Sequence, residues 1–279
     1  MHDSVPQQFV MEAEALLRLY WKENNARMSL SFGACILSCV PVRSAADHFS
    51  EMRTQLLYGD HFTILEQRKK WSKIRIAFDR CEGWILNNQL ITTTADEFKN
   101  FEAIANPKFV SELLAFAETE QKVLIPLMIG SCLDKVTFFS HQYHGSFLAE
   151  KARKSDLIKT AMCYINAPFM WGGKTPFGID CSGFTQMVYK INGYPLLRDV
   201  GQQATQGEVL SFIEESEAGD LAFFDNADGN IHHVGILMDN HYIIHVHGKV
   251  RIDRIDHTGI FNVETKRYTH KLRVIKKIL

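Results

Sequence analysis

A cysteine at the start of a predicted helix is the residue best placed for chemistry. The stretch PFGIDCSGFTQMVYKING sets Cys181 between Asp180 and Ser182, and apolar residues at helical spacing follow it until Gly193. Backbone N–H groups in the first helical turn lack intrahelical partners and carry partial positive charge, which stabilises a thiolate and can hold an oxyanion. We therefore expect Cys181 to be a nucleophile, although position alone leaves open an ordinary small residue at a helix start.

Histidines are the candidates for a general base. The stretch IHHVGI puts His232 and His233 on opposite faces of a predicted strand, and IIHVHG puts His245 and His247 on one face of the next. An imidazole base needs a second group to fix its tautomer. Histidines at this density could also bind zinc, but the sequence has neither a cysteine pair nor HExxH spacing. We therefore expect no metal site and no cofactor.

The turn between the two histidine strands decides which faces meet. A two-residue turn would direct His245 away from His233. A three-residue loop pairs Met238 with Tyr242, which sets His247 opposite His233 and His245 diagonal to it on the same face. We predict this loop, or a bulge with the same effect, and a hydrogen bond between the rings of His245 and His233. Strand geometry alone does not separate His245 from His247.

The elements that position these residues fall into several regions. A chain of 279 residues fits two or three domains. Residues 30–92 alternate short β-branched and aromatic runs with turns, which is typical of a small β-barrel. Residues 93–154 predict a helix that begins with a capping box, followed by strands compatible with a second small barrel. Residues 155–279 predict helices and then antiparallel strands, an α+β domain. Residues 1–29 predict a helical extension.

Charge and hydropathy argue against two classes of partner. Lys and Arg (31) nearly balance Asp and Glu (32), so no overall field favours nucleic acid or an anionic membrane. No apolar run reaches 18 residues, and Glu12, Glu14 and Arg18 interrupt what would be the core of a signal peptide. We therefore expect a cytoplasmic chain with reduced thiols, whose oligomeric state stays open. Five cysteines are expected to be buried small side chains: Cys35, Cys39, Cys81, Cys132 and Cys163.

Four motifs in order, WGGKTPFGIDCSGF, AGDLAFF, HHVGI and IIHVHGKVRID, resemble the NlpC-type cysteine peptidases, papain-like enzymes that cut bacterial cell-wall peptides. The resemblance covers about residues 157–279. It implies that Cys181 is the nucleophile, His233 the base and His245 the third catalytic residue. It also implies that the residues flanking the nucleophile, Asp180 and Ser182, touch the substrate.

Residues 30–92 look like the bacterial SH3 domains that precede this catalytic domain in the γ-D-glutamyl-L-diamino-acid endopeptidases. In that subgroup an acidic residue after Tyr-Gly and a Tyr before Glu-Gly-Trp are implied to clamp a substrate amine. Asp60 keeps the first, whereas Cys81 replaces the second. Phe169 stands where the family usually has a Tyr that helps to hold the oxyanion, and Val200 where a small or hydroxylic residue is common.

The resemblance implies a cysteine endopeptidase that acts on short murein peptides with a free N-terminal L-Ala. Its target would be the bond between γ-D-glutamate and meso-diaminopimelate or lysine. The alternative is an attenuated or altered-specificity peptide-binding protein that keeps the fold. The presence of all three catalytic side chains favours the peptidase. In either case short murein-derived peptides are the expected partners, with no nucleic acid and no membrane.

Overall fold

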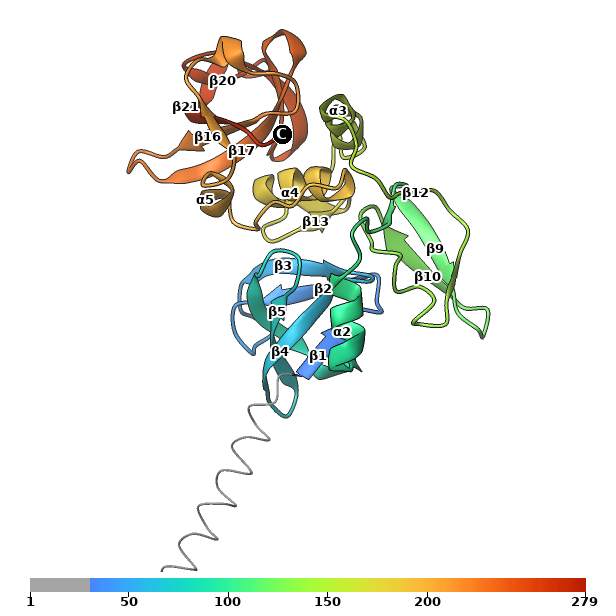
Figure 1. Cartoon of the computed structure of the whole chain (residues 1–279). Helices are drawn as coiled ribbons and strands as arrows, with labels where there is room; N and C mark the ends of the chain where they lie inside the picture. The colour runs from blue at the N-terminus through green and yellow to red at the C-terminus, as the bar shows by residue number, and fades with distance from the viewer. Residues whose placement is uncertain (1–30) are drawn as a thin grey trace, which may run out of the picture.

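The computed structural model describes residues 31–279, so the helical extension expected in residues 1–29 lies outside the described residues. Three groups of strands follow one another along the chain (Figure 1), and helices cluster at the start of the last group. The chain is therefore mixed α+β, as the sequence predicts. Among the described residues, every helix is too short or too polar to reach across a bilayer.

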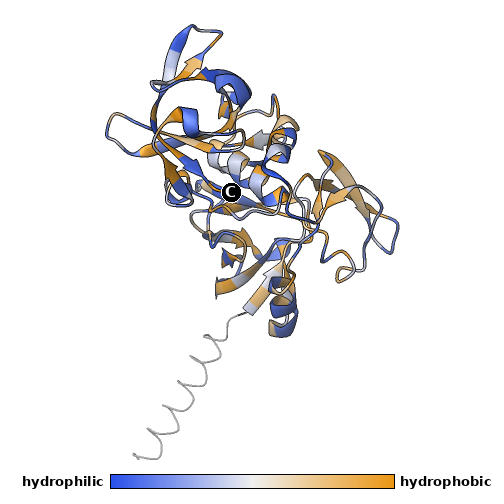
Figure 2. Ribbon diagram, turned by 45° about the horizontal axis from the view of Figure 1, so that its top comes forward, coloured by the Kyte–Doolittle hydropathy of each residue, from blue (hydrophilic) through white to orange (hydrophobic). Residues whose placement is uncertain are grey.

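An antiparallel seven-stranded sheet forms the first region, with strand order β3-β2-β6-β5-β4-β1-β7. Apolar residues alternate along its strands: on β4, Phe62 and Ile64 are buried in the core while Thr63 between them is half-buried. Figure 2 shows hydrophobic and hydrophilic segments interspersed along the strands of the first and last regions. The strands are β1 (Ser31–Ala34), β2 (Cys39–Arg43), β3 (Met52–Leu57), β4 (His61–Gln67), β5 (Trp71–Ile76), β6 (Glu82–Leu86) and, after the short helix η1 (Asn87–Gln89), β7 (Ile91–Thr93).

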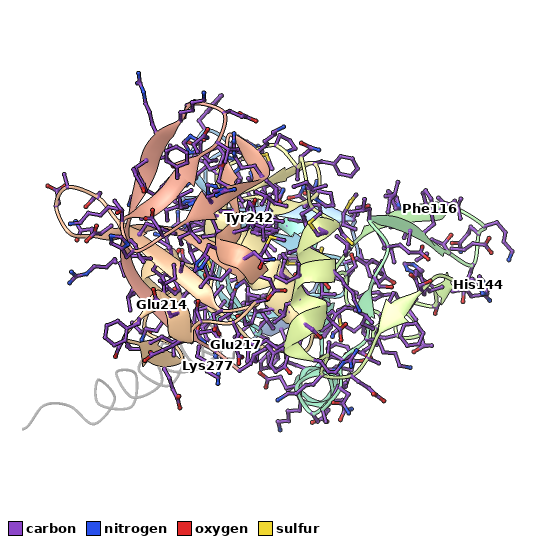
Figure 3. The ribbon with its side chains drawn as sticks, turned by 90° about the horizontal axis from the view of Figure 1, so that it is seen from above. Phe116, His144, Glu214, Glu217, Tyr242 and Lys277 are labelled. Atoms are coloured by element: carbon purple, nitrogen blue, oxygen red, sulfur yellow. The ribbon has the colours of Figure 1, made fainter. Side chains whose placement is uncertain are left out.

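The middle region begins with helix α2 (Ala95–Glu102) and its predicted capping box is confirmed. The Glu97 N–H donates to Thr94 Oγ1 at 3.2 Å, and the Thr94 N–H donates to the Glu97 carboxylate at 2.7 Å. The short strands that follow make a three-stranded and a two-stranded sheet, and their apolar core includes Ala34 and Tyr58 of the first region. Figure 3 shows Phe116 and His144 on this projecting segment. Its strands are β8 (Phe109–Val110), β9 (Leu114–Glu118), β10 (Leu124–Met128), β11 (Gln142–Tyr143) and β12 (Phe147–Leu148).

The last region is a closed barrel with helices against it. Its sheet has the order β15-β21-β16-β17-β18-β19-β20, and an additional pairing of β21 with β20 closes it. The helices are α3 (Lys154–Met162), α4 (Cys181–Ile191), α5 (Val200–Gln203), η2 (Ile213–Glu215) and η3 (Asp239–His241). The strands are β13 (Lys174–Thr175), β14 (Gly178–Ile179), β15 (Glu208–Leu210), β16 (Leu221–Asp225), β17 (Ile231–Met238), β18 (Tyr242–His247), β19 (Lys249–Ile255), β20 (Gly259–Asn262) and β21 (Arg267–Lys277).

The hairpin between β17 and β18 has the predicted register. The three residues of η3 form the loop, and Met238 pairs with Tyr242. Two left-handed residues, Asn240 and His241, both with φ of 59°, make this short loop turn back on itself. Further along the ladder Gly235 pairs with His245, so the histidines of the two strands share a face. The register prediction is therefore confirmed.

Helix α4 lies between the first region and the barrel (Figure 1) and is buried on all sides except at Cys181. Apolar residues such as Phe184 and Val188 pack in the core shared with the barrel. Polar residues on the other side meet the first region. Gln186 Nε2 donates to the Asp79 carboxylate at 3.0 Å, and Lys190 Nζ lies 2.7 Å from Asp60 Oδ1.

Replacing Asp60 by Asn is expected to destabilise the fold by about 3–5 kcal/mol, because Lys190 would keep a buried charge without its partner. The double variant Asp60→Asn/Lys190→Met should recover much of this loss. Replacing Glu118, which forms an exposed pair with Lys122, by Gln should cost about 0–1 kcal/mol and serves as the control. Denaturant unfolding measures all three. An Asp60→Asn loss no larger than that of the control would contradict this account of the interface.

The same pair makes stability depend on pH. Burial opposes ionisation of Asp60, but Lys190 and Lys174 outweigh it and hold its pKa below 3.8. The contribution of Asp60 is therefore present above its unfolded pKa and lost as pH falls through its folded pKa.

Candidate active site

Helix α4 begins at Cys181, and the preceding residue fixes that start. Asp180 is the N-cap: its carboxylate accepts from the Gly183 N–H at 2.6 Å and from the Gly172 N–H at 2.8 Å. The buried guanidinium of Arg198 donates to both oxygens of the same carboxylate, at 2.6 and 3.0 Å. Asp180 thus ties the helix start to the loop before it, and its acceptor sites are already used by the protein.

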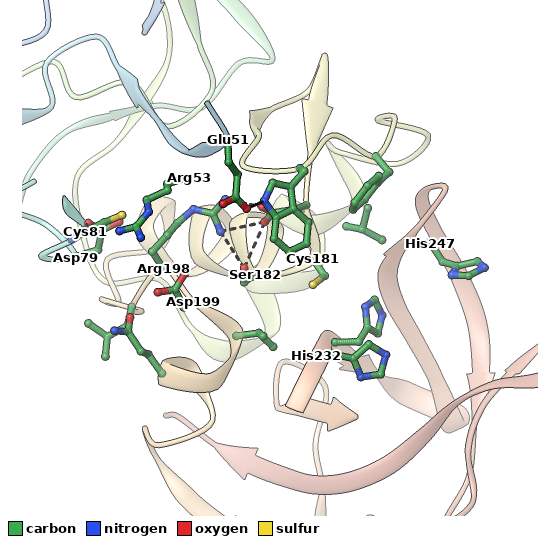
Figure 4. Close-up of a pocket in the computed structure, with 18 of the residues that line it drawn as sticks. Glu51, Arg53, Asp79, Cys81, Cys181, Ser182, Arg198, Asp199, His232 and His247 are labelled. Carbon is green, nitrogen blue, oxygen red and sulfur yellow. Dashed lines mark hydrogen bonds and ion pairs between the residues drawn. The ribbon is translucent and has the colours of Figure 1, made fainter. Parts of the chain in front are cut away.

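Arg198 also holds the residue after the nucleophile. Its Nη1 donates to Ser182 Oγ at 2.9 Å, and its Nε donates to Thr54 Oγ1 of β3 at 2.9 Å. These bonds, several of them dashed in Figure 4, link the first region to the start of α4. The sequence alone assigns no role to Arg198, because its partners lie 16 to 144 residues away along the chain.

A cleft of about 880 Å³ lies between the first region and the barrel. Most of the residues singled out from the sequence line it, from both sides. In Figure 4 the Cys181 sulfur points across the cleft toward the strands that carry His232 and His247. The singled-out residues in its lining are Cys81, Phe169, Asp180, Cys181, Ser182, Val200, His232, His233 and His247.

Three side chains from neighbouring strands form a hydrogen-bonded chain behind the cleft. His233 Nε2 lies 2.9 Å from His245 Nδ1, as predicted, and His245 Nε2 lies 3.1 Å from Asp253 Oδ2. Asp253 on β19 pairs with Ile243 on β18, which puts its side chain on the same face of the sheet as His245. The sequence analysis missed Asp253; the alternation of β18 and β19 is the signal that could have found it. His247 is exposed, and the bond to His233 comes from His245.

The chain of bonds fixes the tautomers. Burial opposes ionisation of Asp253, but hydrogen bonds from His245 and Arg251 outweigh it and lower its pKa to about 2. An ionised carboxylate only accepts hydrogen bonds, so His245 must donate through Nε2–H and accept at Nδ1. His233 then donates through Nε2–H, which leaves a lone pair on its Nδ1. That nitrogen can act as a general base.

Burial and the nearby carboxylate oppose the thiolate that the helix start was expected to stabilise. Burial, and then the neighbouring Asp180 carboxylate, raise the pKa of Cys181 to about 12. Burial, followed by the adjacent histidines, lowers the pKa of His233 well below its usual range. The loss of solvation exceeds what backbone N–H groups at the helix start provide. A neutral thiol and a neutral imidazole result, so nucleophilic attack requires proton transfer from Cys181 to His233.

Asp60 lies outside the cleft, contrary to the expectation that it meets a substrate amine. Only 5% of it is exposed, and its carboxylate is occupied by Lys190 and by the Leu57 N–H at 2.9 Å. The physical reason is the buried cation on α4, which needs a partner of opposite charge. Cys81, by contrast, lies at the wall of the cleft, next to Asp79.

The expectation that the five remaining cysteines are buried is wrong for three of them. Cys35 and Cys132 are buried, Cys39 and Cys81 are partly exposed, and Cys163 is exposed. Cys163 is the C-cap residue of α3, where the helix meets solvent. Exposure therefore does not distinguish Cys181 from every other thiol.

Comparisons with known proteins agree with both regions. Residues 166–272 match the model of the NlpC/P60 family, and residues 42–90 match that of the bacterial dipeptidyl-peptidase SH3 domain. A gamma-D-glutamyl-L-lysine dipeptidyl-peptidase of Bacillus subtilis is 28% identical over 213 residues, which are 70% of this chain and 72% of that protein. A probable endopeptidase p60 of Listeria welshimeri is 40% identical over 106 residues, 37% of this chain and 20% of that protein.

The fold is shared with a solved structure. The crystal structure of an NlpC/P60 family protein from Bacillus cereus superposes with a TM-score of 0.71 and 20% identity, covering 89% of this chain and 100% of that one. The chain thus combines a bacterial SH3 domain with a papain-like NlpC/P60 cysteine peptidase domain, and it is homologous to the gamma-D-glutamyl-L-lysine dipeptidyl-peptidases.

Proposed function

We propose that this peptidase hydrolyses the bond between γ-D-glutamate and a diamino acid in short murein peptides that carry a free N-terminal L-Ala. The observation that carries the proposal is the position of Cys181 and His233 in a cleft whose far wall is the SH3 domain. A wall there limits how far a peptide extends beyond the scissile bond. The name of the Bacillus subtilis relative supports the bond type.

The proposed reaction begins with proton transfer. His233 Nδ1 takes the Cys181 proton as the sulfur attacks the carbonyl carbon of the γ-D-glutamyl amide. The Cys181 backbone N–H, free at the helix start, donates to the oxygen of the tetrahedral intermediate. The His233 imidazolium then protonates the departing amine of the diamino acid and leaves a thioester. His233 next takes a proton from water as the water oxygen attacks the thioester carbonyl. The His233 imidazolium then returns that proton to the sulfur, which regenerates the thiol and releases the dipeptide acid.

The SH3 end of the cleft has the charges that an L-Ala-γ-D-Glu unit requires, which are one partner for an ammonium and one for a carboxylate. Burial raises the pKa of Cys81 to about 11; the carboxylates of Asp79 and Asp199 act in the same direction, while Arg198 and Lys174 oppose them. Asp79 is engaged by Gln186, whereas the carboxylate of Asp199 has no hydrogen-bond partner within residues 31–279. We assign the substrate ammonium to Asp199. Arg53 also lines this end and suits the α-carboxylate of D-Glu.

Two residues of the cleft support the alternative, which is an attenuated or altered-specificity peptide-binding protein. Phe169 lacks the hydroxyl that family members usually offer to the oxyanion, and a single such donor is typically worth about 2.7–4 kcal/mol of barrier. Cys81 lacks the phenol that would contact the amine. A purified chain that binds the peptide without cleaving it would favour this alternative.

The substrate proposal is tested with L-Ala-γ-D-Glu-meso-diaminopimelate, free and N-acetylated, by measuring release of the diamino acid. The free peptide should be cleaved with a kcat/KM at least tenfold above that of the acetylated one, and Cys181→Ala should abolish cleavage. Asp199→Asn should raise KM for the free peptide and leave the acetylated one little changed, because only the former offers an ammonium. Asp228→Asn, in an exposed turn, is the control. Equal effects of Asp199→Asn on both peptides would remove the assignment.

Replacing Asp253 by Asn is expected to lower kcat about tenfold to hundredfold with little change in KM. An amide can donate to His245 Nε2, which reverses both tautomers and puts a proton on the His233 nitrogen that must accept one. Glu264→Gln, which alters the other carboxylate bound by Arg251, should stay near the wild-type rate. His245→Ala should reduce the rate more than His247→Ala does. Wild-type kcat and KM in Asp253→Asn would contradict the proposed role of Asp253 in fixing the two histidine tautomers.

A further inference from the structure

We infer that His233, His245 and His270 form a zinc site that holds the peptidase inactive. Each offers one ring nitrogen, and the three nitrogens lie within 4.8 Å of one another. The ligands come from β17, β18 and β21, so no single short sequence motif contains all three of them. The expectation of no metal site rested on local spacing, which cannot detect ligands that the pairing of distant strands brings together.

Zinc binding requires the ring of His270 to turn, because the three nitrogens lie up to 4.8 Å apart and this ring is stacked on that of His233. Zinc binds imidazole nitrogen at 2.0–2.1 Å, so two ligands of a tetrahedral site stand about 3.3 Å apart. The nitrogens of His233 and His245 are already 2.9 Å apart. The His270 ring stacks on that of His233 with centroids 4.1 Å apart, and both line the cleft, which gives an ion a path from solvent.

The surroundings prepare the ligands. Asp253 accepts from His245 Nε2, the arrangement in which a carboxylate orients a metal-binding histidine and leaves its other nitrogen free. The Asp253 carboxylate also supplies negative charge close to the cation.

Zinc in this position would block the base. Its bond to His233 Nε2 requires the lone pair there, so the imidazole proton moves from Nε2 to Nδ1. Nδ1 is the nitrogen that must accept the Cys181 proton. The hydrogen bond between His233 and His245 is replaced by two bonds to the metal, and no net proton is gained or lost. The inhibition rests on the proposed function, whereas binding of the ion does not.

Binding is tested by calorimetric titration of Zn²⁺ into the full chain carrying Cys181→Ala, which has no thiol at the site. We expect one ion per chain. His270→Phe keeps a stacked ring without its nitrogens and should weaken binding at least tenfold. His144→Phe, an exposed histidine on the projecting segment (Figure 3), should leave binding unchanged. The proposal is overturned if no saturable Zn²⁺ binding is found, or if His270→Phe binds Zn²⁺ as tightly as its parent. It is also overturned if His247→Phe weakens Zn²⁺ binding more than His270→Phe does.

Two further measurements keep the test decisive. Melting temperatures establish that His270→Phe is folded, and His270→Gln replaces it if it is not. The chain with Cys181 intact should lose peptidase activity in Zn²⁺ and regain it with a chelator. His270→Phe, compared with its own metal-free rate, should need at least tenfold more Zn²⁺ for the same inhibition. Tight binding without inhibition would overturn the inhibitory role, while failure of cleavage altogether would leave the titration as an independent test of the site.

Discussion

The hydrogen bond between His245 Nε2 and the Asp253 carboxylate can run in only one direction, and the chemistry of the site depends on that direction. The carboxylate accepts, so each imidazole along the chain has a determined tautomer and the lone pair emerges at His233 Nδ1. Burial keeps both histidines neutral. Weak solvation disfavours a resting thiolate–imidazolium pair, and the mechanism therefore places charge separation in the reaction itself.

Burial of α4 between two domains has a parallel effect at the nucleophile. The helix start is held by Asp180 and Arg198, and Arg198 is held in turn by Thr54 of the SH3 domain. The SH3 domain therefore does more than wall the cleft, because it fixes the guanidinium that positions the residues around Cys181. The buried Lys190 on the same helix requires a carboxylate from the SH3 domain, and Asp60 supplies it.

Local patterns predicted much of this arrangement. The helix start at Cys181, the capping box at Thr94 and the three-residue loop between β17 and β18 follow from residue types and spacing, and the structure has all three. The face on which each histidine lies followed from the loop length, since successive residues of a strand point to opposite faces of the sheet. The family resemblance predicted that an SH3 domain precedes a papain-like catalytic domain along the chain.

Properties that depend on burial or on distant partners could not be predicted in this way. Burial raises the pKa of Cys181, a desolvation effect that opposes the helix-start effect visible in the sequence. Asp60 follows Tyr-Gly as the resemblance requires, yet its carboxylate forms an ion pair with Lys190, 130 residues away in the sequence. His270 joins the histidines because β16 pairs with both β17 and β21, strands that lie far apart in the sequence. Asp253 joins them through the neighbouring strands β18 and β19.

The account is tested most directly by ¹⁵N NMR of the histidine-labelled, metal-free chain at neutral pH, with Cys181 intact and a chelator present. Side-chain shifts report which ring nitrogens carry protons. We predict that His233 and His245 are both neutral and protonated at Nε2, with an unprotonated Nδ1 on each. A doubly protonated His233, the mark of a resting thiolate–imidazolium pair, or a proton on His233 Nδ1 would contradict it.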